Sequence, residues 1–424
     1  MKNYFLQIGS AVLVAGSWGL SVFLLWAFHR QWWGVRWVRR LSWQLPLAGL
    51  MFVGLWYLGY SLDLFAVSVA AAVGTIMFIT TGLALLIALP FSGTVLSLER
   101  LAKWIAAKWS RPKAPAATLP TSVPAAASPA AVASAETLPS PMRRSLLAKG
   151  AVVIPGTLLA ANAWGLADAW SAVHIPTVPL RYPNLPAELR GLRILHLSDI
   201  HLGYFIFMKD LEECMIAAER FRPDLVLVSG DVADELHELP AALRMIADLK
   251  PRYGTFASLG NHEYYRGIGT VQKSFDRSPI PLLREEGTAV RVGEGSQLFI
   301  GGADDPARNG KERDRPQFLQ RTVDATLQGA PSDAFHILMS HRPEGWDRAA
   351  QEGIELTVAG HYHGGVQIGF GGRGIIEPLV PNNYIWGHYQ RGNSHLYTSA
   401  GVGHWLPFRL GCPREAPLYV LEQA

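Results

Sequence analysis

The sequence predicts an α/β domain preceded by an all-α transmembrane region. Three apolar stretches before residue 98 are long enough to cross a bilayer, and beyond residue 180 short β-type runs alternate with amphipathic stretches. The 424 residues include 14 Trp and only 17% charged residues, a composition typical of a chain partly embedded in lipid. We therefore divide the chain into a helical region (1–98), a linker (99–145), a further apolar segment (146–175) and a globular domain (180–424).

The predicted membrane spans are Ile8–Phe28, Leu45–Tyr60 and Leu64–Phe91. The second is the shortest; an extension to Leu64 and a buried amphipathic helix both stay open for it. Lys and Arg gather at residues 30–40 and 100–113, which places both segments on the cytoplasmic side and the amino terminus outside. Because these stretches carry few charges, they are interpreted as an anchor, with a transporter or membrane sensor as the alternative.

A basic segment and then an Ala/Pro-rich segment separate the third span from the next apolar stretch. Residues 111–141 contain almost no large apolar residue, so they are expected to form a disordered or semi-extended linker. Ala151–Ala172 then follows Arg143, Arg144 and Lys149 and predicts a fourth span or signal-anchor-like helix, which would place the remaining chain outside the cytoplasm. An interfacial helix and a cytoplasmic domain are the alternative, because Pro155, Asn162 and Asp168 interrupt the stretch.

Charge and cysteine content exclude several classes of protein. The formal net charge is +4, but no long stripe of Lys and Arg is present, so no nucleic-acid partner is expected. Two cysteines, Cys214 and Cys412, are too few for a disulfide framework or a zinc ribbon. They are either buried thiols or one bridge in an oxidising compartment.

Five predicted strands of the globular domain each end in a polar residue able to bind a metal ion. They are "RILHLSD", "DLVLVSGD", "TFASLGN", "FHILMSH" and "LTVAGH". Helical patterns at Lys209–Phe221 and Ala241–Leu249 alternate with these strands. Ligands of α/β sheets collect at the carboxyl ends of strands, so residues far apart in the sequence are expected to converge there.

The residues at these strand ends form an ordered set. They are Asp199 and His201 in "SDIH", Asp231 and Asp234 in "GDVAD", Asn261 and His262 in "GNHE", His341 in "MSHRP", and His361 and His363 in "GHYHGG". Each pattern alone is common in proteins, but five in order at the same end of predicted strands indicate a metal site. For Asp234 the alternative is a helix N-cap before Glu235.

This ordered set resembles the calcineurin-like metallophosphoesterase superfamily over Leu192 to Leu421. The glycine pair after the last motif, the "DDP" at 304–306 and the ending "GVGHWLPFRLGCPREAP" resemble its bacterial branch of membrane-anchored or exported members. The resemblance implies a metallophosphoesterase-type β-sandwich flanked by helices and hydrolysis of a phosphate ester or pyrophosphate bond. Tyr362 and "PREAP" depart from the usual pattern, so the family's substrates are not carried over.

The resemblance also assigns the ligands of two divalent metal ions. Asp231 would bridge the ions, the first completed by Asp199, His201 and His363 and the second by Asn261, His341 and His361. This mixture of oxygen and nitrogen donors suits Mn, Fe, Zn or Ni better than Ca. A hydroxide between the ions would be the nucleophile, because bound cations lower the pKa of water from 15.7 toward about 7.

Other residues are expected to act on the substrate. His262 would protonate the leaving group or stabilise the phosphoryl charge, and Asp234 would orient its ring. Arg342 and Arg409 are expected to bind phosphate oxygens, with a surface salt bridge as the alternative.

Together these expectations describe a multi-pass enzyme of the inner membrane with its catalytic domain outside the cytoplasm. Its expected partners are the bilayer and a phosphorylated small-molecule, lipid-linked or cell-envelope substrate. A catalytically degenerate metal-binding scaffold is the alternative function, and the sequence does not indicate an oligomeric state.

Overall fold

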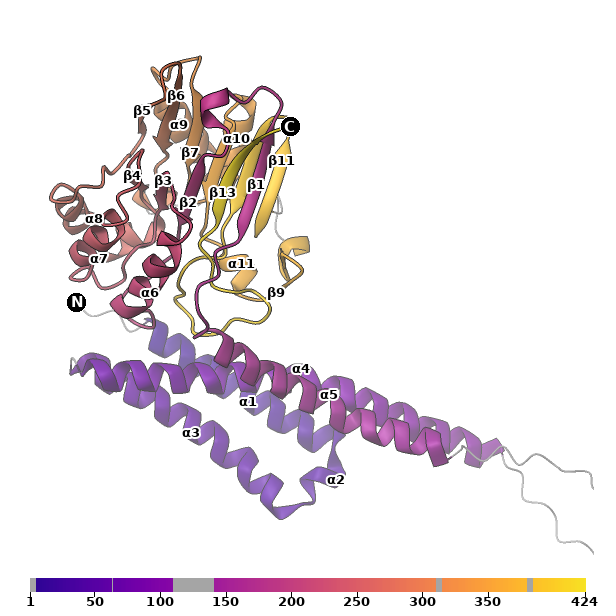
Figure 1. Cartoon of the computed structure of the whole chain (residues 1–424). Coiled ribbons are helices and arrows are strands. Elements are labelled where there is room, and N and C mark those ends of the chain that lie inside the picture. The colour runs from indigo at the N-terminus through magenta and orange to yellow at the C-terminus, as the bar shows by residue number, and fades with distance from the viewer. Residues whose placement is uncertain (1–4, 63, 110–140, 310–314, 380–383) are drawn as a thin grey trace, which may run out of the picture. The chain divides into compact units, whose positions relative to one another are not determined.

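A computed structural model describes residues 5–62, 64–109, 141–309, 315–379 and 384–424 (Figure 1). The chain divides into two compact units, Met1–Asn162 and Ala163–Ala424. Most of the predicted linker, residues 110–140, lies outside the described residues.

The first unit is helical. Its helices are α1 (Phe5–Phe28), α2 (Arg30–Trp33), α3 (Arg36–Ser61), α4 (Phe65–Trp109) and α5 (Pro141–Asp168), which continues into the second unit. Helix α4 extends through residues 99–109, which the sequence analysis assigned to the linker, because Ala, Leu, Lys and Glu there are strong helix formers.

Three of these helices are long and apolar enough to cross a membrane. Their apolar parts are Gln7–Phe28, Arg36–Ser61 and Phe65–Thr94, and they contain almost all of the predicted spans. Within the described residues, α5 is not among them, so the fourth span stays a prediction.

Close helix contacts hold α1 against α4. The Trp18 indole Nε1 donates a hydrogen bond to the carbonyl oxygen of Phe78 at 2.8 Å, and the Ser21 hydroxyl bonds the carbonyl oxygen of Gly82 at 3.2 Å. A side chain at Gly82 would collide with Trp18. Small residues of this kind let membrane helices approach closely enough for such bonds.

The second unit contains two stacked sheets. The first has the strand order β1-β13-β2-β3-β4, with bounds Thr177–Tyr182, Leu418–Gln423, Arg193–Leu197, Leu225–Ser229 and Thr255–Ser258. The second has the order β11-β12-β8-β7-β6-β5, with bounds Gly387–Arg391, Ser394–Thr398, Leu356–Ala359, Phe335–Met339, Ser296–Gly302 and Glu286–Val292. A short hairpin pairs β9 (Gly369–Phe370) with β10 (Arg373–Gly374).

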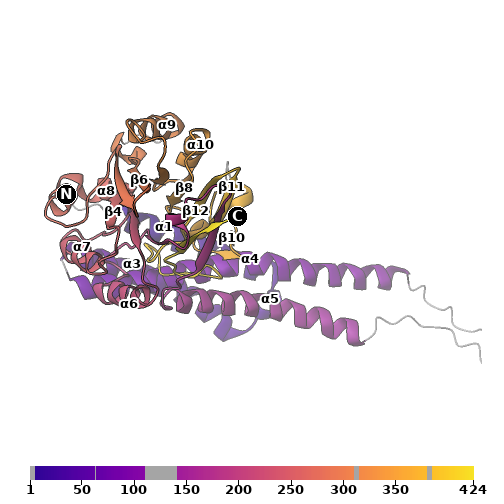
Figure 2. The same cartoon turned by 45° about the horizontal axis from the view of Figure 1, so that its top comes forward.

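Helices cover both outer faces of the paired sheets (Figure 2). The first sheet packs against α6 (Met208–Glu219), α7 (Leu239–Ala247) and α8 (Asn261–Phe275), and the second against α9 (Arg315–Thr326) and α10 (Trp346–Gln351). A further short helix, α11, consists of residues His363–Val366. The predicted class, a β-sandwich flanked by helices, is therefore confirmed.

Strand β3 shows why the predicted strands are apolar throughout. Leu225 and Leu227 join the core between the two sheets, whereas Val226 and Val228 join the core beneath the helices. Because side chains alternate along a strand, one that is covered on both faces needs apolar residues at every position.

The parallel strands of both sheets set the position of the site. Strands β2, β3 and β4 run parallel, as do β6, β7 and β8, so the carboxyl ends of the strands in each set gather at one edge of their sheet. Cys214 and Cys412 are both buried free thiols, so the bridge left open by the sequence does not form.

Candidate metal centre

The seven predicted ligands all lie just beyond the carboxyl ends of parallel strands. Asp199 and His201 follow β2, Asp231 follows β3, Asn261 follows β4, His341 follows β7, and His361 and His363 follow β8. Both sheets therefore contribute to one cluster, as the sequence predicts from the position of these residues at the ends of strands.

A left-handed backbone conformation is common among these residues. The φ angles are 51° at Asp199, 53° at His201, 54° at Asp231, 70° at His361 and 47° at His363. Residues other than glycine rarely adopt this conformation, which costs roughly 1–3 kcal/mol each. The surrounding fold thus holds the chain in strained turns that aim these side chains into the cluster.

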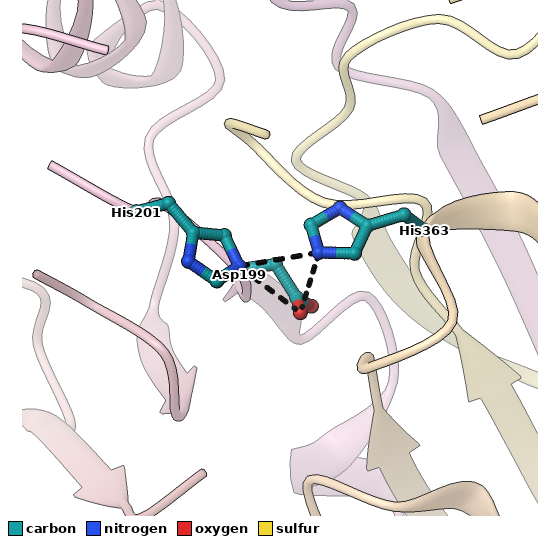
Figure 3. A group of neighbouring side chains, drawn as sticks. All are labelled: Asp199, His201 and His363. Atoms are coloured by element: carbon teal, nitrogen blue, oxygen red, sulfur yellow. Dashed lines mark hydrogen bonds and ion pairs between the residues drawn. The ribbon is translucent and has the colours of Figure 1, made fainter. Parts of the chain in front are cut away.

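The first group of ligands is Asp199, His201 and His363 (Figure 3). The Nε2 atoms of the two histidines lie 3.1 Å apart, and His363 Nε2 lies 3.3 Å from Asp199 Oδ1. His201 Nε2 lies 3.9 Å from the same carboxylate oxygen. All three side chains are buried, so two imidazole nitrogens and one carboxylate oxygen converge on a single point.

The second group is Asp199, Asp231 and His341. His341 Nδ1 donates a hydrogen bond to the Ser229 carbonyl oxygen at 2.8 Å, which turns Nε2 toward Asp231 Oδ2 at 3.2 Å. The same oxygen lies 3.7 Å from His201 Nε2, a member of the first group. Asp199 belongs to both groups, and Asp231 of the second group also faces His201 of the first, as a bridging ligand would.

Electrostatics favour positive charge at this point. Burial opposes the charged form of His341, but the Asp231 carboxylate outweighs it and raises the pKa of His341 to about 10. Burial likewise opposes ionisation of Asp231, but His341, His262 and His201 hold its pKa well below the usual range. The cluster is thus built to attract a cation.

Asn261 supplies an independent sign that a cation fits. Its side chain is buried, and its Oδ1 has no hydrogen-bond partner within the described residues. Leaving a buried amide oxygen unpaired costs about 1–3 kcal/mol, and coordination to a metal ion would satisfy it. The mixture of carboxylate, amide and imidazole donors also suits a divalent transition metal.

His361 lies at the edge of the cluster. Its backbone N–H donates hydrogen bonds to the Asp199 carboxylate at 3.1 Å, and its ring packs edge-on against His341. Burial and the neighbouring Arg342 hold the pKa of His361 well below its ordinary value, so its ring is neutral. In this structure Arg342 Nη1 donates to His361 Nε2 at 3.0 Å.

His262 and Asp234 form a pair beside the metal cluster. His262 Nδ1 lies 2.6 Å from Asp234 Oδ1, and Arg266 donates to the same oxygen at 3.0 Å. Burial disfavours the imidazolium, but Asp231 and Asp234 raise the pKa of His262 to about 9. Asp234 does not cap a helix, since the N-cap of α7 is Glu238.

The two arginines predicted to bind substrate lie in different places. Arg342 is buried at the cluster, where its Nε donates to Asp305 Oδ2 at 2.9 Å, so it is not a surface salt bridge. Arg409 is also buried, and its guanidinium donates to the carbonyl oxygens of Ala400, Gly401, Gly403, Cys412 and Pro413. This placement corrects the expectation for Arg409, because its terminal nitrogens hold a loop together.

The sequence analysis missed Glu263. This buried carboxylate accepts backbone hydrogen bonds from Asp231 at 2.9 Å, Val232 at 2.9 Å and Gly260 at 2.8 Å, and so joins two turns that carry ligands. A glutamate three residues after the start of a helical pattern is a signal for this role, because an N3 carboxylate commonly bonds the N-cap backbone.

Comparisons with known proteins agree with this geometry. The sequence model of the calcineurin-like phosphoesterase family matches residues 192–365, a range that includes all seven predicted ligands. An uncharacterized metallophosphoesterase of Aquifex aeolicus is 32% identical over 229 residues, which cover 50% of this chain and 84% of that protein. The chain belongs to the calcineurin-like phosphoesterase family.

Two other relatives of this calcineurin-like phosphoesterase differ in how much of their length matches. The uncharacterized metallophosphoesterase YkuE of Bacillus subtilis is 26% identical over 276 residues, which cover 63% of this chain and 92% of YkuE. A transmembrane protein with metallophosphoesterase domain from Danio rerio is 28% identical over 278 residues, which cover 62% of this chain and 60% of that protein. A metallophosphoesterase domain therefore occurs in a transmembrane protein outside this chain as well.

The close packing of Gly360 against the cluster predicts that a small substitution disrupts metal binding. A methyl group at Gly360 would collide with the Asp199 carboxylate and the Ser198 hydroxyl. We expect Gly360→Ala to weaken divalent-metal affinity about 10- to 100-fold, because Asp199 must move. Metal content per purified chain, measured after equilibration with manganese, checks this.

Gly269→Ala is the matched control, because no atom lies within 4 Å of the added methyl group there. Equal manganese affinity in the Gly360→Ala variant and the control would contradict the assignment of Asp199 as a ligand.

Proposed function

We propose that this protein is a membrane-anchored, two-metal phosphoesterase that hydrolyses a phosphate ester or pyrophosphate bond. The observation that carries the proposal is the position of Asp231, whose carboxylate faces His201 of one ligand group and His341 of the other. A carboxylate shared in this way is what a pair of adjacent cations requires. Membership of the calcineurin-like phosphoesterase family supports the reaction class.

The ligand sets are those that the family resemblance implies, and the structure brings together Asp199, His201 and His363, and also Asp199, Asp231 and His341. The first cation would be held by Asp199, His201, His363 and the shared Asp231, and the second by Asp231, Asn261, His341 and His361. Bound divalent ions would supply Lewis acidity toward the phosphoryl oxygens and lower the pKa of water toward about 7. For His361 to bind, Arg342 must release its Nε2, which would leave that guanidinium beside the substrate phosphate.

His262 is proposed to act on the leaving group. Its ring is only partly buried, with 20% of the side chain exposed, whereas Asp199, His201 and His363 are buried. Asp234 fixes the ring through Nδ1, and its carboxylate favours the imidazolium, which carries a proton on Nε2. A proton held in this position can be donated to the departing oxygen.

Membrane anchoring narrows the proposed substrates. Three apolar helices keep the catalytic unit at a bilayer, which favours a lipid-linked or cell-envelope phosphate ester over a freely diffusing metabolite. The basic residues beside the spans, together with the predicted fourth span at Ala151–Ala172, would place the catalytic unit outside the cytoplasm. The mixed oxygen and nitrogen donors suit Mn, Fe, Zn or Ni as the bound ions.

The central position of Asp231 predicts a large loss of activity when its charge is removed. We expect Asp231→Asn to reduce hydrolysis of para-nitrophenyl phosphate, or of its diester, by on the order of a hundredfold or more in the presence of manganese. The amide keeps the size of the side chain but removes the negative charge shared by the two cations. Asp333→Asn, at an exposed carboxylate, is the control with the same chemical change. Undiminished turnover of Asp231→Asn would rule out the shared-carboxylate scheme.

The position of His262 predicts a dependence on the leaving group. We expect His262→Ala to slow hydrolysis of alkyl phosphates by about 10²–10⁴-fold and that of para-nitrophenyl phosphate much less, because nitrophenolate departs without a proton. Turnover of both substrates, measured at equal metal content, separates this role from a merely structural one. His237→Ala, at a largely exposed histidine, is the control. A similar loss on both substrates would argue against proton donation.

A further inference from the structure

Most of the exposed large apolar side chains of the second unit belong to three neighbouring segments. In the described part of this unit there are nine such side chains, and two of them, Ile216 and Tyr265, stand apart. The other seven, here called the apolar end, are Trp164, Trp170, Val366, Phe370, Ile375, Leu379 and Trp405. Single exposed apolar residues are ordinary, but a contiguous group of this kind marks an interaction surface.

Backbone hydrogen bonds join the three segments that carry the apolar end. The Arg409 N–H donates to the Gly165 carbonyl oxygen at 2.7 Å, which ties the loop at 404–411 to the end of α5. The Leu410 N–H donates to the Gln367 carbonyl oxygen at 2.9 Å, which ties the same loop to the segment after α11. Figure 1 shows α11 and β9 at the end of the unit where the chain arrives from α5.

The β9–β10 hairpin displays its apolar residues on a tight turn. Gly371 and Gly372 connect the strands with φ angles of 61° and 77°, the conformation of a two-residue turn with positive φ at both positions. Phe370 before the turn and Ile375 after it are 64% and 55% exposed, and Leu379 farther on is 82% exposed. The hairpin thus holds large apolar groups in water, where each is unfavourable.

Charge around the apolar end suits a lipid surface. Residues 364–376 and 404–411 contain no Asp or Glu, and the third segment, 164–170, has a single acidic residue, the partly buried Asp168. The first acidic residue beyond the hairpin, Glu377, is 2.5 Å from Arg373 in an ion pair. Anionic headgroups would repel uncompensated carboxylates, and three of the seven side chains are Trp, a residue enriched where lipid meets water.

The apolar end is connected through α5 to the predicted membrane region of the chain. Residues 151–167 of α5 contain no charged residue, and the last turns of this helix belong to the second unit. The first unit contributes three helices able to span a membrane, so the protein already resides at lipid. The apolar end therefore continues an apolar helix in a protein that is held at a membrane.

We infer that the apolar end of the catalytic unit inserts into the interfacial layer of the bilayer, with Phe370, Ile375 and Leu379 reaching the acyl chains. Groups of this kind enter about 5–10 Å into the boundary between headgroups and acyl chains. The inference concerns lipid contact alone and does not depend on the phosphoesterase activity proposed above.

Fluorescence quenching in a bilayer tests the inference on the full chain. Single cysteines are introduced as Phe370→Cys, Leu379→Cys and, as a control at an exposed apolar position on α6, Ile216→Cys. Because Cys214 and Cys412 are buried, the parent chain is expected to take little label. Each variant carries an environment-sensitive fluorophore in bilayers of phosphatidylcholine and phosphatidylglycerol.

Two quenchers distinguish lipid contact from water contact. We expect labels at positions 370 and 379 to lose about half of their fluorescence or more in bilayers with brominated acyl chains and to be shielded from aqueous iodide. The label at position 216 should be quenched by aqueous iodide and should keep its fluorescence in bilayers with brominated acyl chains. If the Phe370→Cys variant does not fold, Ile375→Cys replaces it.

Two results would overturn the inference. Labels on the apolar end that respond like the control would show that this surface stays in water. Labels shielded from both quenchers would show that another protein surface covers it, either the helical unit or a second copy of the chain. Neither result depends on whether the chain hydrolyses a phosphate ester.

Discussion

The buried carboxylate of Asp231 is the constraint on which the rest of the site depends. A charge of this kind is costly away from water unless partners surround it. The partners come from separate strand ends: His201 after β2 at 3.7 Å, His341 after β7 at 3.2 Å, and the His262 backbone after β4 at 2.8 Å. Both sheets must therefore keep their register for this charge to be tolerated, which links the stability of the sandwich to the geometry of the site.

Strained turns and a buried glutamate maintain that geometry. The left-handed backbone at Asp231, with φ of 54°, is accompanied by a hydrogen bond from its N–H to Glu263. Glu263 also binds the Gly260 N–H in the turn that precedes Asn261, so one carboxylate fixes two ligand-bearing loops. Strained backbone conformations persist at functional sites when several surrounding contacts hold them in place, as these hydrogen bonds do.

The sequence was sufficient to predict the cluster because its ligands sit at regular places. Parallel strands bring their carboxyl ends to one edge, and each predicted ligand comes within a few residues of such an end. Contacts made by loops could not be predicted in this way. The carbonyl oxygens that surround Arg409 come from a loop whose path has no periodic signal, so a substrate contact was expected there and a structural one was found.

The apolar end was missed for a related reason. Phe370, Ile375 and Leu379 lie in a glycine-rich stretch with no more than two apolar residues in a row, so no period or run of the sequence marks them as a surface. Only the hydrogen bonds between the loop at 404–411 and its neighbours bring them together. His363 lies in the cluster and is the first residue of α11, and Val366 of the apolar end is the last residue of the same short element, so the proposed site and the proposed lipid contact share it.

Anomalous X-ray diffraction from crystals of the manganese-equilibrated protein tests the central claim most directly. Two anomalous peaks about 3.5–4 Å apart, with the Asp231 carboxylate between them and Asn261 against only one of them, are the predicted result. A single peak, or a pair that the Asp231 carboxylate does not join, would contradict the account.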